Sequence, residues 1–214
     1  MADKLESERR EYSYGDLDRE SLHEDPVEQF RRWMDEAIAK DIQDPTAMTV
    51  ATVSPDNRPW SRIVLLKGYG ENGFRFYTSF DSRKGREIAH NPAVTLHFPW
   101  LQMDRQVIIG GCAARLPIKQ AEAYFASRPR ESRIAAWISH QSSEIPSRES
   151  LDEAYDEAAR KFEGKDIPLP ENWGGYVVEP DCFEFWQGGE HRLHDRFRYD
   201  RDERGAWRIV RLSP

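Results

Sequence analysis

The chain has 214 residues and a formal net charge of −7, from 31 Lys and Arg against 38 Asp and Glu. This length is enough for one domain with a real hydrophobic core, and an aromatic content of 12% argues against a disordered chain. The acidic balance disfavours long-range attraction to nucleic acid or to an anionic membrane. A local cluster of cations in this chain would therefore suit a compact anion better than a polyanion.

The sequence contains two cysteines, Cys112 and Cys182. Two cysteines provide neither a disulfide framework nor the spacing of a zinc ribbon. The chain shows no pattern of a secretory signal and no apolar run long enough to span a bilayer. We therefore expect a cytoplasmic protein in a reducing compartment.

Residues 1–24 mix charges without apolar periodicity, which predicts a flexible N-terminal arm followed by a single domain over residues 25–214. Asp25 and Pro26 then predict the start of a helix, with Asp25 as N-cap and Pro26 in the first turn. Apolar residues recur at helical spacing after them and predict one buried stripe, at Val27, Phe30, Trp33, Met34, Ala37 and Ile38.

From Ala47 the apolar period changes to two, which predicts strands joined mostly by short turns. Short turns imply antiparallel pairing, and closure into a barrel avoids bare edges. We expect an α+β fold with an antiparallel barrel core and flanking helices. Strands are predicted over residues 48–53, 59–67, 74–78, 93–98, 105–115, 176–178, 183–187, 197–199 and 207–212, and helices after Ser82, over residues 118–127 and from a capping box at Ser150.

Residues 68–73 match G-x-G-x-x-G, the pattern of a dinucleotide-binding loop. That motif requires a helix after it, whose N-terminus holds the pyrophosphate. Here an alternating aromatic run, Phe74 to Tyr77, follows instead. We therefore predict a hairpin loop without a nucleotide.

Two basic segments are candidate anion sites. Arg83 and Lys84 follow Ser82, so a helix capped by Ser82 would add free backbone N–H groups to their charges. A solvated basic turn is the alternative. The strand from Arg62 to Lys67 has an apolar middle and a cation at each end, which suits a flat anionic ligand, although an ordinary core strand has the same pattern.

Residues 183–197 run from an aromatic strand through Gly188 and Gly189 to two histidines and two arginines. Glycines allow close approach of backbone, and arginines bind phosphate or carboxylate, so we predict the wall of a site for a planar anionic molecule. His191 and His194 also raise the possibility of a metal, but Arg192 and Arg196 are interleaved with them, and we predict no metal site. No nucleophile elbow accompanies these histidines, which disfavours a hydrolase triad.

Taken together, segments along nearly the whole chain resemble the pyridoxamine 5′-phosphate oxidase family. The matching segments are Arg9–Tyr12, Asp44–Met48, Arg62–Lys67, Phe76–Thr78, Ser82–Lys84, Phe98–Trp100, Arg105–Val107, Tyr124–Phe125, Ser127–Arg130, Gln141–Ser143, Trp173–Gly175 and residues 183–197.

The resemblance implies an FMN-binding split β-barrel that forms a homodimer with FMN at the subunit interface. It implies oxidation of pyridoxamine or pyridoxine 5′-phosphate to pyridoxal 5′-phosphate in vitamin B6 metabolism, with O2 as acceptor and with H2O2, and NH3 from the amine, as products. Arg192 and His194 match the family's catalytic positions beside the substrate ring. The FMN positions are matched by Arg62, Ile63, Val64, Leu65, Leu66, Lys67, Tyr77, Thr78, Arg83, Lys84, Gln106, Gln141, Ser142, Trp186 and Arg196. The substrate positions are matched by Arg9, Arg10, Glu11, Tyr12, Lys67, Tyr124, Arg128, Ser132, Arg192, Leu193 and His194.

Two alternatives remain open from the sequence. A related split-barrel flavin reductase would not need a second phosphate pocket, so Tyr124, Arg128, Arg192 and His194 argue against it. A non-catalytic protein that binds FMN or pyridoxal phosphate could keep the same cations and lack turnover.

Overall fold

The computed structural model describes residues 10–214, which divide into two compact units. Unit 1 contains the described residues up to Thr49, together with Thr95–Gly111 and Pro180–Pro214, and unit 2 contains Val50–Val94 and Cys112–Glu179. The prediction of a single domain over residues 25–214 stays a prediction. The predicted contact of Arg9 with the substrate lies outside the described residues.

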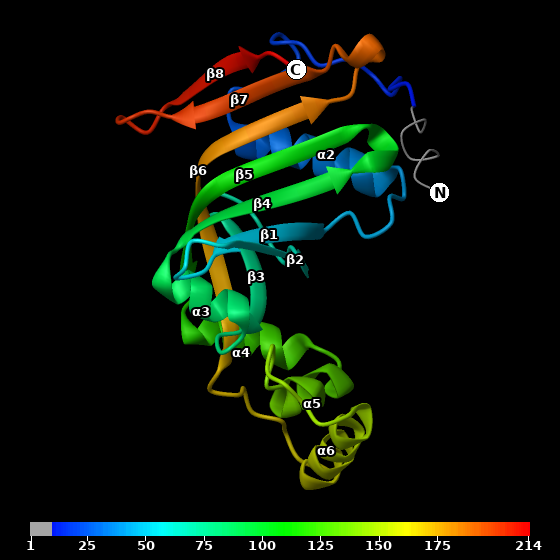
Figure 1. Cartoon of the computed structure of the whole chain (residues 1–214), viewed down its shortest axis with the longest axis vertical. Helices are drawn as coiled ribbons and strands as arrows, with labels where there is room; N and C mark the ends of the chain where they lie inside the picture. Colours follow the sequence, from blue (N-terminus) through cyan, green and yellow to red (C-terminus); the bar gives the residue numbers. More distant parts are fainter. Residues whose placement is uncertain (1–9) are drawn as a thin grey trace. The chain divides into compact units, whose positions relative to one another are not determined.

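The strands are hydrogen-bonded in the order β2-β1-β4-β5-β6-β7-β8, and β3 pairs with β6 (Figure 1). The registers of β3 with β6, β6 with β7 and β7 with β8 are antiparallel. The predicted α+β class with an antiparallel sheet is therefore confirmed. The strands are β1 (Ala47–Val53), β2 (Pro59–Leu65), β3 (Phe74–Ser79), β4 (Ala93–Trp100), β5 (Arg105–Arg115), β6 (Trp173–Gln187), β7 (Asp195–Arg201) and β8 (Trp207–Leu212).

In unit 1, helix α2 (Pro26–Ala39) buries Phe30, Trp33, Met34 and Ala37 of the predicted stripe, whereas Ile38 is exposed, so the prediction is wrong for that residue. The Asp25 side chain accepts a hydrogen bond from the Val27 N–H, as the sequence predicts for an N-cap, and such a cap contributes about 1 kcal/mol. Phe30 contacts Phe98 edge-to-face with ring centroids 4.9 Å apart, and Trp33 contacts Phe185 in the same way at 5.3 Å. All four rings are buried, so these two contacts belong to the hydrophobic core of unit 1.

Residues 10–24 lie against the rest of unit 1 along part of their length. Leu17 and Leu22 are buried. The Leu17 N–H donates to the Asp195 carboxylate at 3.0 Å, and the Tyr199 hydroxyl donates to the His23 carbonyl at 2.8 Å. Flexibility of the arm over residues 1–24 stays a prediction.

Unit 2 holds β2, β3 and the helices α3 (Arg83–His90), α4 (Ile118–Ser127), α5 (Arg130–Ile138) and α6 (Arg148–Lys161). Helices α5 and α6 lie side by side (Figure 1). Their shared core extends to α4 and to the start of β6, through Phe125, Ile134, Ala158, Phe162, Ile167 and Trp173.

The predicted hairpin loop is confirmed, because β3 follows residues 68–73 directly. The Gly68 carbonyl accepts from the Arg75 N–H at 2.7 Å, which closes the loop. Gly73 has φ +91°, a left-handed conformation that only glycine adopts readily.

Two predicted boundaries are wrong. Helix α6 begins at Arg148, because Ser147 is its N-cap and forms the capping box with Ser150. The predicted strands 176–178 and 183–187 are one strand, β6, which contains Pro180. Proline lacks a donor but is tolerated here, because β3 pairs with residues up to 178 and β7 with residues from 182 onward.

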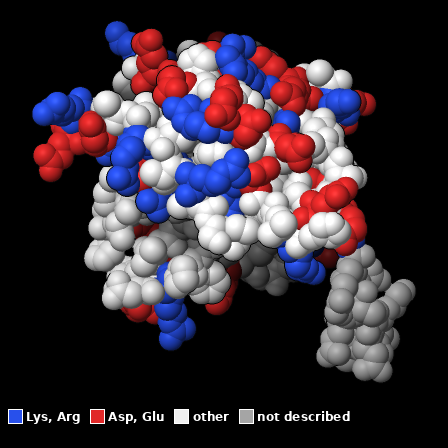
Figure 2. Space-filling view, turned by 90° about the horizontal axis from the view of Figure 1, so that it is seen from above, with Lys and Arg blue, Asp and Glu red and all other residues white. Residues whose placement is uncertain are grey.

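Cationic and anionic side chains alternate on the face seen in Figure 2, without a large area of one sign. This face therefore lacks the continuous positive stripe by which a protein follows a polyanion. No helix among residues 10–214 is both long and apolar enough to cross a bilayer.

Candidate active site

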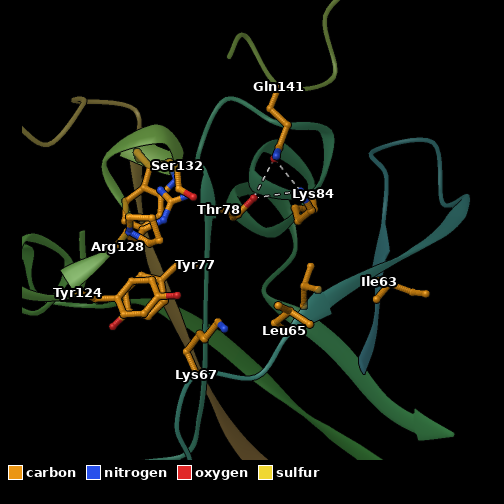
Figure 3. Close-up of a pocket in the computed structure, with 13 residues that line it drawn as sticks. Ile63, Leu65, Lys67, Tyr77, Thr78, Lys84, Tyr124, Arg128, Ser132 and Gln141 are labelled. Atoms are coloured by element: carbon orange, nitrogen blue, oxygen red, sulfur yellow. Dashed lines mark hydrogen bonds between the residues drawn. The ribbon is translucent and has the colours of Figure 1, made fainter. Parts of the chain in front are cut away.

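A cavity of about 480 Å³ opens in unit 2 beside β2, β3 and the helices α3 to α5 (Figure 3). Figure 3 shows Tyr124, Arg128 and Ser132 on one side of it and Lys84 and Gln141 on another. Two groups of predicted site residues, distant in sequence, therefore share one space. The lining residues are Ile63, Val64, Leu65, Lys67, Tyr77, Thr78, Lys84, Tyr124, Arg128, Pro129, Ser132, Gln141 and Trp173.

Lys84 lies in the first turn of α3, where Ser82 caps the helix by accepting from the Gly85 N–H, as predicted. The Lys84 ammonium is buried and donates to Thr78 Oγ1 at 3.0 Å and Gln141 Oε1 at 2.8 Å. Burial, and then the charge of Arg62, lower its pKa to about 8. A buried ammonium with neutral partners beside a helix N-terminus is an anion site.

Arg62 lies next to this group and is held by a buried network that the sequence analysis missed. Its guanidinium donates to Thr52 Oγ1 at 2.5 Å and to the Glu87 carboxylate at 3.2 Å. Glu87 is itself buried and accepts from the Thr52 hydroxyl at 2.5 Å. Because Glu87 comes one turn after Lys84 on α3, one helix supplies both a cation and the carboxylate that orients the neighbouring cation.

The second cationic group is centred on Arg128, which is the C-cap of α4. Its guanidinium carbon lies 4.9 Å from the centroid of the Trp173 ring, and its Nη1 is buried without a hydrogen-bond partner among residues 10–214. Burial lowers the pKa of Arg128 although Tyr124 raises it, and the group stays charged near neutral pH. A buried donor without a partner costs free energy, so this side chain is suited to receive an acceptor from a ligand.

Stacked aromatic rings line the cavity on the side of Arg128 (Figure 3). The rings of Tyr77 and Tyr124 are 3.9 Å apart, and those of Tyr77 and Trp173 are 5.6 Å apart, both nearly parallel. Burial raises the pKa of both tyrosines, so their hydroxyls stay protonated and can donate. The sequence analysis assigned Trp173 no role, because only the fold brings β6 beside β3 and α4.

Two predicted site residues of unit 1, Tyr12 and His194, contact Trp186 at the end of β6. The His194 ring lies 4.7 Å from the Trp186 ring, and the Tyr12 ring contacts both edge-to-face at 5.2 and 5.7 Å. A Cβ added at Gly188 would lie 2.6 Å from the Tyr12 ring, so glycine is required for this contact. His194 Nδ1 accepts from the Gly189 N–H at 3.2 Å, which leaves Nε2 for a ligand.

The turn that carries Arg192 is strained. His191 and Arg192 have φ of 54° and 64°, left-handed values that are uncommon for non-glycine residues. Two such residues in succession are costly and occur most often at functional sites. Arg192 and Leu193 are exposed, so the turn presents both side chains to solvent within unit 1.

Other predicted cofactor residues have protein partners. Arg196 forms an ion pair with Glu184 at 2.8 Å, and His97 Nε2 lies 3.0 Å from Gln106 Oε1. The Arg83 guanidinium stacks 3.9 Å from the Trp60 ring centroid. Leu66 is buried and does not line the cavity, and Ser142 is exposed with φ 70°. Among residues 10–214, no three His, Cys, Asp or Glu side chains are placed to hold a metal ion.

Comparisons with known proteins identify the family of the chain. A family model described as pyridoxamine 5′-phosphate oxidase matches residues 34–160, and one described as pyridoxine 5′-phosphate oxidase C-terminal dimerisation region matches residues 173–214. The chain is 51% identical over 211 residues to a pyridoxine/pyridoxamine 5′-phosphate oxidase of Idiomarina loihiensis, covering 98% of this chain and 99% of the relative. A relative of the same name from Shewanella woodyi is 51% identical over 212 residues, covering 99% of each chain.

Solved structures show the same fold. PhzG from Burkholderia lata 383, in complex with tetrahydrophenazine-1-carboxylic acid, superimposes with a TM-score of 0.87 at 30% identity, covering 92% of this chain and 98% of that chain. A pyridoxamine 5′-phosphate oxidase-related, FMN-binding protein of Nostoc punctiforme gives a TM-score of 0.71 at 16% identity, covering 86% and 97%. The fold is therefore a split β-barrel with flanking helices. The chain belongs to the pyridoxamine 5′-phosphate oxidase family.

Proposed function

We propose that this protein is an FMN-dependent oxidase that converts pyridoxamine and pyridoxine 5′-phosphate to pyridoxal 5′-phosphate. The observation that carries the proposal is the pairing of two cationic groups, around Lys84 and around Arg128, in one cavity. Two phosphate-bearing ligands, a cofactor and a substrate, need two such groups. The names of the relatives at 51% identity support the same activity.

The residues around Lys84 fit the phosphate of FMN. The buried ammonium, the Arg62 guanidinium and the N-terminus of α3 supply positive charge, and Leu65 gives an apolar surface beside them. Arg83, Gln141 and Ser142 complete the proposed phosphate side. The isoalloxazine ring would lie along Arg62–Lys67. The family resemblance also assigns Gln106, Trp186 and Arg196 to FMN.

The residues around Arg128 fit the phosphate of the substrate. The orphaned Nη1 of Arg128, the Tyr124 hydroxyl, the Ser132 hydroxyl and the Lys67 ammonium all lie on this cavity. A dianionic phosphate accepts several hydrogen bonds and would satisfy the Arg128 donor. A flavin reductase acting on a ligand without phosphate would leave that donor unpaired.

Arg192 and His194 act on the substrate ring in this proposal. FMN, when bound, would supply the two-electron oxidation of the substrate at its 4′ carbon, with O2 as final acceptor and H2O2 as product. Arg192 would hold the ring in position and balance its charge, and His194 would donate a hydrogen bond through Nε2, because its Nδ1 accepts from the Gly189 N–H. Their contribution is orientation and electrostatics. With the amine substrate, water would then hydrolyse the imine product and release NH3.

The proposal includes a homodimer with FMN at the interface. Strand β2 ends the hydrogen-bonded order and exposes Trp60, Ile63 and Leu65, with Ile63 73% exposed. Exposed apolar side chains on an edge strand are typical of a protein interface. The match of residues 173–214 to a dimerisation region supports the same assembly. A solution mass of twice the 25.0 kDa of the chain is expected by light scattering, and a monomer at micromolar concentration would contradict it.

A flavin assay tests the proposed activity directly. The purified protein is expected to be yellow, and anaerobic addition of pyridoxamine 5′-phosphate should bleach the flavin absorbance, since electrons leave the substrate without an acceptor beyond the cofactor. Pyridoxamine without phosphate is the matched control, and it should bleach far more slowly. Colourless protein that does not take up FMN would refute the cofactor. Flavin that stays oxidised would instead favour a binding protein without turnover.

The cytoplasmic location remains part of the proposal. It is supported by the free thiols of Cys112 and Cys182, which are compatible with a reducing compartment.

A further inference from the structure

Asp104 occupies an unusual position between the 3-10 turn Leu101–Met103 and strand β5. Its φ is 50°, in the left-handed region, where aspartate and asparagine are better tolerated than most residues. The residue is only 8% exposed. A buried carboxylate in this conformation is expected to have a specific partner.

The carboxylate of Asp104 binds the N-terminal segment. Arg10 Nη2 donates to Oδ1 at 2.5 Å, and the backbone N–H of Ser13 donates to Oδ2 at 3.3 Å. Arg10 also donates to the Leu101 carbonyl at 3.1 Å. The carboxylate thus holds the chain on both sides of Tyr12.

The backbone of Asp104 binds the loop around Gly188, against which the Tyr12 ring packs. Its carbonyl accepts from the Gly188 N–H at 2.7 Å and from Gln187 Nε2 at 3.3 Å. The Tyr12 ring packs against Gly188 and against the rings of Trp186 and His194. Asp104 therefore binds the segment that carries Tyr12 through its side chain, and it binds the loop against which Tyr12 packs through its main chain.

We propose that Asp104 is a positioning residue that clamps residues 10–13 onto the Trp186–His194 loop and so fixes the Tyr12 ring against His194. The neighbouring Arg105 does not compete for the carboxylate, because its guanidinium is bound to Glu36 and Gln187. The clamp rests on the proposed function only for the substrate contact of His194. The contacts of Asp104 do not depend on the identity of the substrate.

Asp104→Asn is the sharpest variant, because asparagine keeps the size and the tolerance of left-handed φ while it removes the charge that binds Arg10. In the holoenzyme, amide hydrogen exchange in residues 10–17 is expected to become about fivefold faster, the scale of one partly exposed ion pair. The KM for pyridoxamine 5′-phosphate should rise by a similar factor, about fivefold. FMN content and kcat should change little, because the proposed phosphate cradle lies elsewhere, around Lys84.

Three further variants make the result specific. Arg10→Gln should also speed the exchange of residues 10–17, a readout that does not depend on the substrate role predicted for Arg10. The double variant should show less than the sum of the two effects, because both single variants remove the Arg10–Asp104 ion pair. Asp35→Asn is the charge-matched control, since Asp35 pairs with Arg31 on the exposed face of α2 and should leave exchange and KM unchanged. Additive effects of the two clamp variants would overturn the clamp.

The outcomes also separate this inference from the proposed function. If the wild-type protein does not oxidise pyridoxamine 5′-phosphate, the function fails, while the exchange of residues 10–17 still tests the clamp. If exchange in Asp104→Asn is unchanged, or if FMN is lost in parallel with a global rise in exchange, Asp104 is not a clamp.

Discussion

Lys84→Met is expected to weaken FMN binding by about 100-fold while the protein stays folded. The Lys84 ammonium is the buried cation of the cofactor side and donates to Thr78 and Gln141. A charge-assisted hydrogen bond to phosphate contributes about 1.5–3 kcal/mol, which corresponds to about 10- to 150-fold in affinity. Methionine retains the length of the stem without the charge. Titration of the apoprotein with FMN, followed by flavin fluorescence, measures the change.

The pH dependence gives this prediction a second, independent readout. The pKa of Lys84 is lowered to about 8, so the apoprotein loses this charge as pH rises through 8 and FMN affinity should fall there. The free energy of unfolding should respond with the opposite sign. Between pH 8 and about 10.5, the ordinary pKa of lysine, the unfolded chain binds the proton that the native apoprotein has released, so the stability that this lysine contributes rises with pH.

Both pH trends should be absent in Lys84→Met, and the wild-type minus variant difference removes contributions from other groups. Lys119→Met, at an exposed position of α4, is the control for loss of one positive charge. An unchanged FMN affinity in Lys84→Met, with native circular dichroism, would place the cofactor phosphate elsewhere.

Local signals in the sequence predict much of the fold. The N-caps Asp25 and Ser82 and the antiparallel strands follow from capping chemistry and from apolar periodicity. The predicted start of α6 is wrong because Ser147 and Ser150 both suit an N-cap, and only the backbone conformation decides between them. Helix α5 was not predicted at all, since it is short and follows Pro129 in a stretch rich in arginine and serine.

The arrangement of the candidate site, in contrast, does not follow from local signals in the sequence. Arg128 and Lys84 are 44 residues apart along the chain, and no periodicity relates them. The family resemblance assigned them to different ligands. Their common cavity results from packing of α4 and α5 beside β3. Glu87 and Asp104 escaped notice because each acts through another residue. Asp104 had one usable signal, an aspartate between two elements where left-handed turns are common.

Arg128→Met tests the substrate side of the site and should have the mirror-image effect of Lys84→Met. The KM for pyridoxamine 5′-phosphate is expected to rise by about 30- to 100-fold, because the variant removes a forked, charged donor to the phosphate. FMN affinity should stay within about twofold of the wild type, since Lys84 and Arg62 remain and additivity holds between independent sites.

The design of this variant separates charge from packing. Arg128 covers the Trp173 ring at 4.9 Å, and methionine keeps an unbranched stem over that ring. Removal of a buried donor without a partner should also leave the apoprotein as stable as the wild type or more stable. Steady-state kinetics with pyridoxamine 5′-phosphate, FMN titration and urea unfolding on the same preparation measure all three quantities. Equal losses of FMN affinity and of substrate affinity would show that the two cationic groups do not serve separate ligands.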